Sequence, residues 1–161
     1  MRLRLSSDYY AIRERRRELV RERLAQYGLE KKPGVEETFR FLRAKGIKTA
    51  VATATALDIT KSHLTTIGVC DLFDSIVSAK NVAHGKPEPD VYLYACEQIG
   101  ERPQDCMAVE DSPNGIMAAY RAGLRTVMVP DLTQPDEELT KYLYACVNSL
   151  SDLCELVDKE D

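Results

Sequence analysis

From residue 35 onward, short apolar runs alternate with segments of helical periodicity, and this alternation constrains the fold more than any other feature of the sequence. Strands are predicted for the apolar runs 48–52, 75–78, 106–109, 125–129 and 145–148. Helices are predicted from Val35 to Gly46, through Thr60 to Gly68, from Asp90 to Gly100, from Asn114 to Ala122, and from a Ser149 cap through Val157. Such alternation is typical of a parallel sheet with helices on both faces. The expected fold class is therefore α/β.

The first thirty residues have a different character. One helix is predicted over residues 12–27, because its apolar side chains share a stripe: Ile12, Leu19, Val20, Leu24 and Tyr27. A linker follows at residues 31–34. Residues 1–32 carry ten Lys or Arg and five Asp or Glu, a net charge of +5, whereas the rest of the chain carries −9. The sequence thus divides into two parts, 1–32 and 33–161.

The basic charge of the first part does not favour nucleic-acid binding. Its arginines are interleaved with glutamates at spacings that allow pairing along a helix, and no aromatic interleaving accompanies them. No apolar run approaches membrane-spanning length, and the N-terminus lacks the apolar stretch of a signal peptide. We expect a cytoplasmic protein with neither a nucleic-acid nor a membrane partner. The five cysteines, odd in number and widely spaced, suggest neither a disulfide framework nor a zinc site.

Three polar elements stand where an expected strand or loop opens onto a helix: Thr53-Ala54-Thr55, Lys86 and Glu110-Asp111. A hydroxyl beside free helix N–H groups suits a phosphate oxygen, a lysine neutralises phosphate, and adjacent carboxylates suit magnesium. Ligands collect at the carboxyl ends of parallel strands, so one crevice could hold all three elements. Taken singly, each has a simpler interpretation: a strand end with a helix cap, a solvated lysine, and an acidic helix cap.

The combination resembles the second, third and fourth motifs of the haloacid dehalogenase superfamily. Its beta-phosphoglucomutase-like phosphatases and mutases are matched by two stretches of the sequence, Gly85-Lys86-Pro87-x-Pro89-Asp90 and Val109-Glu110-Asp111-Ser112-x-x-Gly115-Ile116-x-Ala118-Ala119-x-x-Ala122-Gly123. The resemblance covers roughly residues 10–157.

The resemblance implies a Rossmann-like core, residues 33–161, with residues 1–32 as the C-terminal remnant of a helical cap. It implies that the Thr53 hydroxyl and the Ala54 backbone N–H hold the transferring phosphoryl group. Lys86 would be the catalytic lysine that neutralises phosphate and nucleophile. Glu110 and Asp111 would position Mg²⁺, the implied cofactor, and the substrate would be a small phosphorylated metabolite.

The sequence departs from this family at the nucleophile. Family members begin with a strand that ends in Asp-x-Asp-Gly-Thr and supplies the phosphorylated aspartate, but no two aspartates here are separated by one residue. That segment would also supply the central strand of the sheet. We therefore expect that central first strand to be absent and the core to be truncated at its N-terminus.

Two functions remain open. The chain is either the C-terminal part of a magnesium-dependent phosphatase or phosphomutase, inactive as an isolated chain, or a non-catalytic relative that binds phosphate and metal or serves as a scaffold. A sheet without its central strand exposes unpaired backbone groups. We expect the chain either to bring its two motif-bearing strands together or to self-associate through the incomplete sheet.

Overall fold

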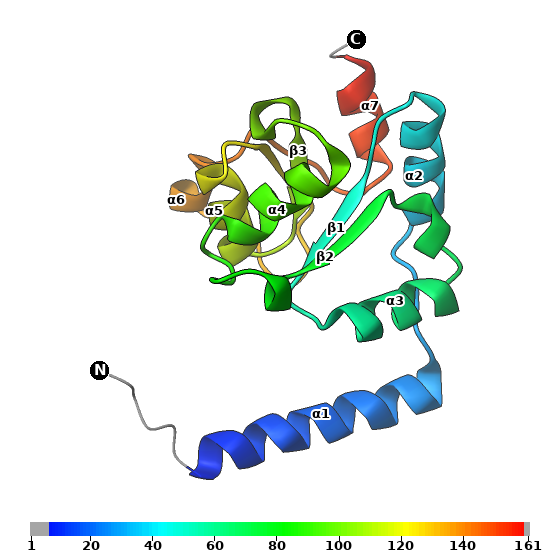
Figure 1. Cartoon of the computed structure of the whole chain (residues 1–161), viewed down its shortest axis with the longest axis vertical. Helices are drawn as coiled ribbons and strands as arrows, with labels where there is room; N and C mark the ends of the chain where they lie inside the picture. The colour runs from blue at the N-terminus through cyan, green and yellow to red at the C-terminus, as the bar shows by residue number, and fades with distance from the viewer. Residues whose placement is uncertain (1–6, 160–161) are drawn as a thin grey trace. The chain divides into compact units, whose positions relative to one another are not determined.

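The computed structural model describes residues 7–159, and the chain divides into two compact units (Figure 1). The first unit reaches Glu30 and the second begins at Lys31. This division lies next to the boundary predicted after residue 32. Whether the first unit is the remnant of a helical cap stays a prediction.

In its described residues, 7–30, the first unit consists of one helix, α1 (Ser7–Tyr27). Its charged side chains form exposed ion pairs along the helix, such as Arg17 with Glu14 at 3.0 Å and Arg15 with Glu18 at 3.1 Å. Pairs of this kind stabilise a helix by only about 0.2 to 0.5 kcal/mol each. The apolar stripe predicted for this helix is largely exposed, with Ile12 at 70%. The predicted helix is confirmed, but its stripe is not buried within the unit.

Five short parallel strands form the centre of the second unit. They are β1 (Ala50–Thr53), β2 (Ser75–Ser78), β3 (Met107–Glu110), β4 (Arg125–Met128) and β5 (Ala145–Cys146). β1 pairs with β2, while β3, β4 and β5 form a second sheet in that order. The pairing runs from Ala50 opposite Ser75 in the first sheet and from Met107 opposite Arg125 in the second.

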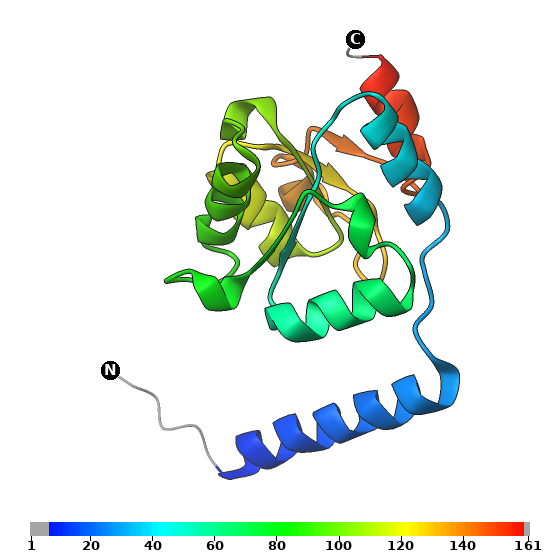
Figure 2. The ribbon, with the colours of Figure 1, turned by 45° about the vertical axis from the view of Figure 1, so that its right-hand side comes forward.

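Helices cover both faces of these strands (Figures 1 and 2). They are α2 (Val35–Ala44), α3 (Leu57–Thr66), α4 (Asp90–Ile99), α5 (Pro113–Arg121), α6 (Glu137–Thr140) and α7 (Asp152–Asp158). α4 packs against β1 and β2, α5 packs against β3 and β4, and α2 packs against α7. The predicted Rossmann-like α/β fold is confirmed.

The main core lies beneath α4 and α5. Val77, Val91, Ala118 and Ala119 are buried in one cluster. Small residues on α5 let this helix approach the strands closely, because alanine side chains occupy little space between backbones. α4 ends where Gly100 adopts a left-handed conformation with φ of 69°, which a residue with a side chain rarely tolerates.

The two sheets remain separate within residues 7–159, because β1 and β3 do not pair. The expected closure of the sheet, in which these two motif-bearing strands come together, is therefore wrong. Two strands that each end in a polar motif instead face a common cleft, described below. Self-association through the unpaired edges stays a prediction.

Near the C-terminus one expectation needs correction, and one helix was not predicted. The last helix starts at Asp152, not after a Ser149 cap, and the Asp152 carboxylate accepts the backbone N–H groups of Asn148 and Ser149 at 3.0 Å. The helix α6 was not predicted, because its four residues are too few to show a period.

None of the helices in the described part of the chain is long and apolar enough to cross a membrane, and the cytoplasmic location stays a prediction.

Candidate active site

A cleft of about 640 Å³ opens at the carboxyl ends of the strands in the second unit. All five residues singled out from the sequence line it: Thr53, Ala54, Lys86, Glu110 and Asp111. Ligand sites in open α/β sheets lie at this edge. The structure thus brings the three predicted polar elements together, while the role of each residue is still a prediction.

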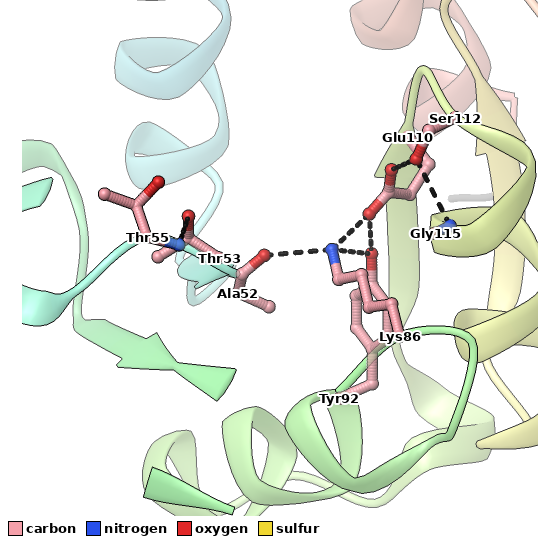
Figure 3. A network of polar contacts seen from close by, with 8 residues as sticks. All are labelled: Ala52, Thr53, Thr55, Lys86, Tyr92, Glu110, Ser112 and Gly115. Carbon is pink, nitrogen blue, oxygen red and sulfur yellow. Dashed lines mark hydrogen bonds and ion pairs between the residues drawn. The ribbon is translucent and has the colours of Figure 1, made fainter. Parts of the chain in front are cut away.

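The loop after β1 is held in place by hydroxyl groups. The Thr55 N–H donates to Thr53 Oγ1 at 3.1 Å (Figure 3). The buried Ser78 hydroxyl on β2 donates to the Thr55 carbonyl at 2.6 Å. Thr55 does not cap α3, whose N-cap is Ala56 with no side-chain hydrogen bond. The first N–H groups of a helix lack intrahelical partners. The Thr53 hydroxyl and the first N–H groups of α3 are donors of the kind that bind anions.

Lys86 is not a solvated loop lysine. Its side chain is 15% exposed, and its Nζ donates to the Ala52 carbonyl at 3.1 Å, to the Tyr92 hydroxyl at 3.2 Å and to the Glu110 carboxylate (Figure 3). An ammonium group has three donors, and all three are used. Lys86 therefore connects β1 of one sheet to β3 of the other.

Glu110, at the end of β3, is held by hydrogen bonds at both of its oxygens. Oε1 accepts from Lys86 and from the Tyr92 hydroxyl, and Oε2 accepts from the Ser112 hydroxyl at 3.2 Å. The side chain is only 8% exposed. A buried carboxylate needs such partners to remain charged.

Ser112 and Gly115 at the start of α5 allow this arrangement. Ser112 is the N-cap of α5, and its Oγ accepts the Gly115 N–H at 3.2 Å. Ser112 caps the helix and Glu110 does not, so the simpler interpretation as an acidic helix cap does not apply to Glu110. A Cβ at Gly115 would overlap the Glu110 carboxylate. Only glycine leaves room for Glu110 at this position.

Tyr92 was not identified from the sequence as a site residue. It lies in the first turn of α4, six residues after Lys86, and its ring lies 4.7 Å from the Lys86 Nζ. Burial, followed by the charge of Glu110, raises the pKa of the Tyr92 hydroxyl above its ordinary value. The hydroxyl therefore stays protonated and donates to Glu110. The available signal in the sequence was its place at the start of the helix that follows the Lys86 motif.

Asp111 differs from its neighbour Glu110. Its side chain is exposed at the cleft, and it takes part in none of the hydrogen bonds or ion pairs found among residues 7–159. That part of the chain holds no group of three or more His, Cys, Asp or Glu side chains that could enclose a metal ion. Mg²⁺ is commonly held by one or two carboxylates together with waters and substrate phosphate. The pair of Glu110 and Asp111 fits that ion, and does not fit a metal that needs a cage of protein ligands.

A second charged pair lies at the rim of the cleft. Lys32 Nζ lies 2.7 Å from Asp131 Oδ1, and both residues line the cleft. Neither was singled out from the sequence. Asp131 follows β4 by three residues, so its place at the carboxyl end of a strand was the available signal.

Comparison with known proteins establishes the family. The sequence model described as haloacid dehalogenase-like hydrolase matches residues 5–123. The chain belongs to the haloacid dehalogenase-like hydrolase family. Hexitol phosphatase B of Escherichia coli K12 is 33% identical over 80% of this chain and 56% of its own length. The chain spans about half the length of the curated relatives it matches.

Solved structures of this hydrolase family share the fold. CbbY from Rhodobacter sphaeroides, solved in complex with phosphate, is 32% identical with a TM-score of 0.68, over 76% of this chain and 55% of that protein. The beta-phosphoglucomutase of Clostridium difficile is 26% identical with a TM-score of 0.69, over 80% and 55% respectively. The resemblance to phosphatases and phosphomutases noted from the motifs is thereby confirmed.

Proposed function

We propose that this chain is the C-terminal part of a magnesium-dependent phosphatase or phosphomutase that acts on a small phosphorylated metabolite. One observation supports this above the others: Lys86 joins the end of β1 to Glu110 within a cleft that also contains Thr53 and the exposed Asp111. Phosphoryl transfer depends mainly on positioning and on stabilising charge, and these groups serve both purposes.

Each group has a task in this proposal. The Thr53 hydroxyl and the Ala54 N–H bind phosphate oxygens, and Lys86 neutralises their charge. Asp111 and Glu110 hold Mg²⁺, which when bound would neutralise charge on the phosphate and orient it. Lys86 and Tyr92 already occupy one Glu110 oxygen, so Asp111 is the more available ligand.

The nucleophile comes, in this proposal, from a segment outside these 161 residues. No two aspartates of the sequence are separated by one residue, as the family's nucleophile motif requires. The 161-residue chain alone should therefore bind magnesium and phosphate without turning substrate over.

The test compares two proteins: the 161-residue chain, and the same chain fused to an upstream segment that carries Asp-x-Asp-Gly-Thr. Hydrolysis of sugar phosphates, measured by phosphate release with Mg²⁺ present, should occur only in the fusion. Asn in place of the first Asp of the added motif is the matched control and should abolish the activity. Robust turnover by the 161-residue chain alone would refute the proposal.

The second candidate, a non-catalytic relative, is favoured by the intact cleft beside the missing motif. It predicts that the fusion stays inactive although it folds. Calorimetry with Mg²⁺ and inorganic phosphate then distinguishes a phosphate- and metal-binding protein from a scaffold protein. The binding protein should bind both ligands, and the scaffold should bind neither.

A further inference from the structure

The hydroxyl of Tyr92 contacts both charged residues at the centre of the cleft. It donates to Glu110 Oε1 and accepts from Lys86 Nζ at 3.2 Å (Figure 3). The residue is 6% exposed. A buried hydroxyl of this kind requires partners, and here its two partners are the groups that the proposed function assigns to metal and phosphate.

The ring and the hydroxyl of Tyr92 act separately. The ring packs in the main hydrophobic core beneath α4. It lies 4.7 Å from the Lys86 ammonium group, a cation–π distance. The hydroxyl alone reaches Glu110. Phenylalanine at this position keeps the ring and removes only the hydroxyl, so the two contributions can be measured apart.

The hydroxyl is one of three side-chain donors that hold the Glu110 carboxylate. Ser112 holds Oε2 through a hydroxyl that also caps α5, which makes this contact rigid. Tyr92 holds Oε1 from the first turn of α4, which is equally rigid. Lys86, the third partner, reaches Oε1 through a stem of four methylenes, which has more rotatable bonds than a tyrosine side chain. Without the Tyr92 hydroxyl, the orientation of Oε1 would depend on Lys86 alone.

We propose that Tyr92 is a positioning residue for the magnesium site, whose hydroxyl fixes the Glu110 carboxylate beside Asp111 and limits the hold of Lys86 on it. The inference rests on the proposed function, in which Glu110 and Asp111 hold the ion. Hydrogen-bond partners of metal ligands commonly change metal affinity by about 10- to 100-fold. Tyr92→Phe should therefore weaken Mg²⁺ binding by about tenfold.

Phosphate binding distinguishes positioning from general structural damage. Thr53, Ala54 and Lys86 are unchanged in Tyr92→Phe, and the lysine even gains a free donor. The affinity for inorganic phosphate should therefore be retained or rise while that for Mg²⁺ falls. A loosened core would weaken both.

The experiment is a pair of titrations of the isotope-labelled 161-residue protein, followed by amide NMR shifts, one with MgCl₂ and one with inorganic phosphate. Tyr94→Phe is the matched control, because it removes the same atom from the same helix at a residue with no hydrogen bond among those found in residues 7–159. It should leave both affinities unchanged. Equal Mg²⁺ affinity in the wild type and Tyr92→Phe overturns the inference while leaving the proposed function intact.

The Glu110→Gln background gives the decisive comparison. If Tyr92 acts through Glu110, Tyr92→Phe should change Mg²⁺ affinity little once Glu110 has lost its charge. An undiminished effect there would overturn the inference. Failure of the wild type to bind Mg²⁺ at all would overturn both the inference and the magnesium dependence of the proposed function.

The wild type supplies a measurement that needs no variant. The Tyr92 hydroxyl proton, buried in a hydrogen bond to a carboxylate, should give a downfield resonance protected from exchange. This resonance should shift on addition of MgCl₂, because the ion draws charge from Glu110, and should respond less to phosphate alone. A hydroxyl resonance insensitive to saturating Mg²⁺ would contradict the proposed role.

Discussion

Replacing Lys86 by Met tests whether the lysine stabilises the fold as well as the site. Met keeps most of the apolar stem but removes the charge that faces Glu110. The two side chains are 15% and 8% exposed, so solvent screens their interaction little. In the variant, Glu110 would remain buried with the hydroxyls of Tyr92 and Ser112 as its only donors among the described residues.

The expected loss follows from these remaining contacts. Removing one partner of a buried ion pair costs about 3 to 5 kcal/mol, because the other charge is left uncompensated. Two hydroxyl donors remain on Glu110, which places the expected loss near the lower limit, at about 3 kcal/mol. For a chain of this size, that corresponds to a fall in Tm of about 6 to 12 °C.

Urea unfolding measures the free energy of unfolding. It is followed by far-ultraviolet circular dichroism, because the chain has no tryptophan to report unfolding by fluorescence. The double variant Lys86→Met with Glu110→Gln should recover much of the loss, because no buried charge is then unpaired. Lys61→Met, on the exposed side of α3, is the control and should change stability by less than about 0.5 kcal/mol. A loss below about 1 kcal/mol for Lys86→Met, or strictly additive effects in the double variant, would refute the argument.

Three more predictions concern packing and thiol reactivity. Gly115→Ala should lose about 1 to 3 kcal/mol and displace the Glu110 carboxylate, because the new Cβ overlaps it. Val91→Ala, at a fully buried position in the main core, should lose about 2 to 3 kcal/mol. Burial raises the pKa of the Cys96 thiol to about 12, so Cys96 should stay protonated and unreactive toward iodoacetamide at pH 8, while the exposed Cys146 reacts.

Each of these has its own control. Gly85→Ala should be nearly neutral, since its new Cβ would meet only Ala79 at 4.0 Å, and equal losses at Gly85 and Gly115 would contradict the packing argument. Leu93→Ala, at a residue that is 43% exposed, should cost less than Val91→Ala. Mass spectrometry of the alkylated protein identifies the modified thiols directly, and modification of Cys96 before Cys146 would contradict the role of burial.

The arrangement of strands and helices was largely predictable, because the apolar runs and the glycines that end helices agree with the observed fold. The run Ser75–Ser78 forms a strand with the predicted bounds. The predicted helix from Asp90 ends at Gly100, where the backbone requires a left-handed residue. The three polar elements were expected at strand ends, and parallel strands place their carboxyl ends at one edge. Their convergence in one cleft thus followed from the sequence.

The partners of these residues were not predictable from local sequence. Tyr92 was not singled out in the predicted helix from Asp90, and nothing in the helical period shows that its hydroxyl meets Glu110 on β3. The predicted cap of the last helix, Ser149, was wrong. The Asp152 carboxylate instead accepts the backbone N–H groups of Asn148 and Ser149, which precede it in the chain, and a cap prediction that looks only for a side chain accepting N–H groups later in the chain does not detect such a contact. A contact between separate elements decides the first case, and a local contact directed backward along the chain decides the second.

The separation of the two sheets gives Lys86 a role that neither its motif nor its charge indicates. Backbone hydrogen bonds do not join β1 to β3, so the relative position of Thr53 and Asp111 is set by helices and side chains. α4 packs on β1 and β2, and its Tyr92 reaches Glu110 on β3, while Lys86 binds Ala52 at one end and Glu110 at the other. The groups that would bind phosphate and metal are therefore held at a fixed relative position by the same lysine that would neutralise the charge of the substrate phosphate. It follows that a variant of Lys86 should disturb the distance between the two half-sites as well as their charge, and that Lys86→Arg, which keeps only the charge, should not restore the site.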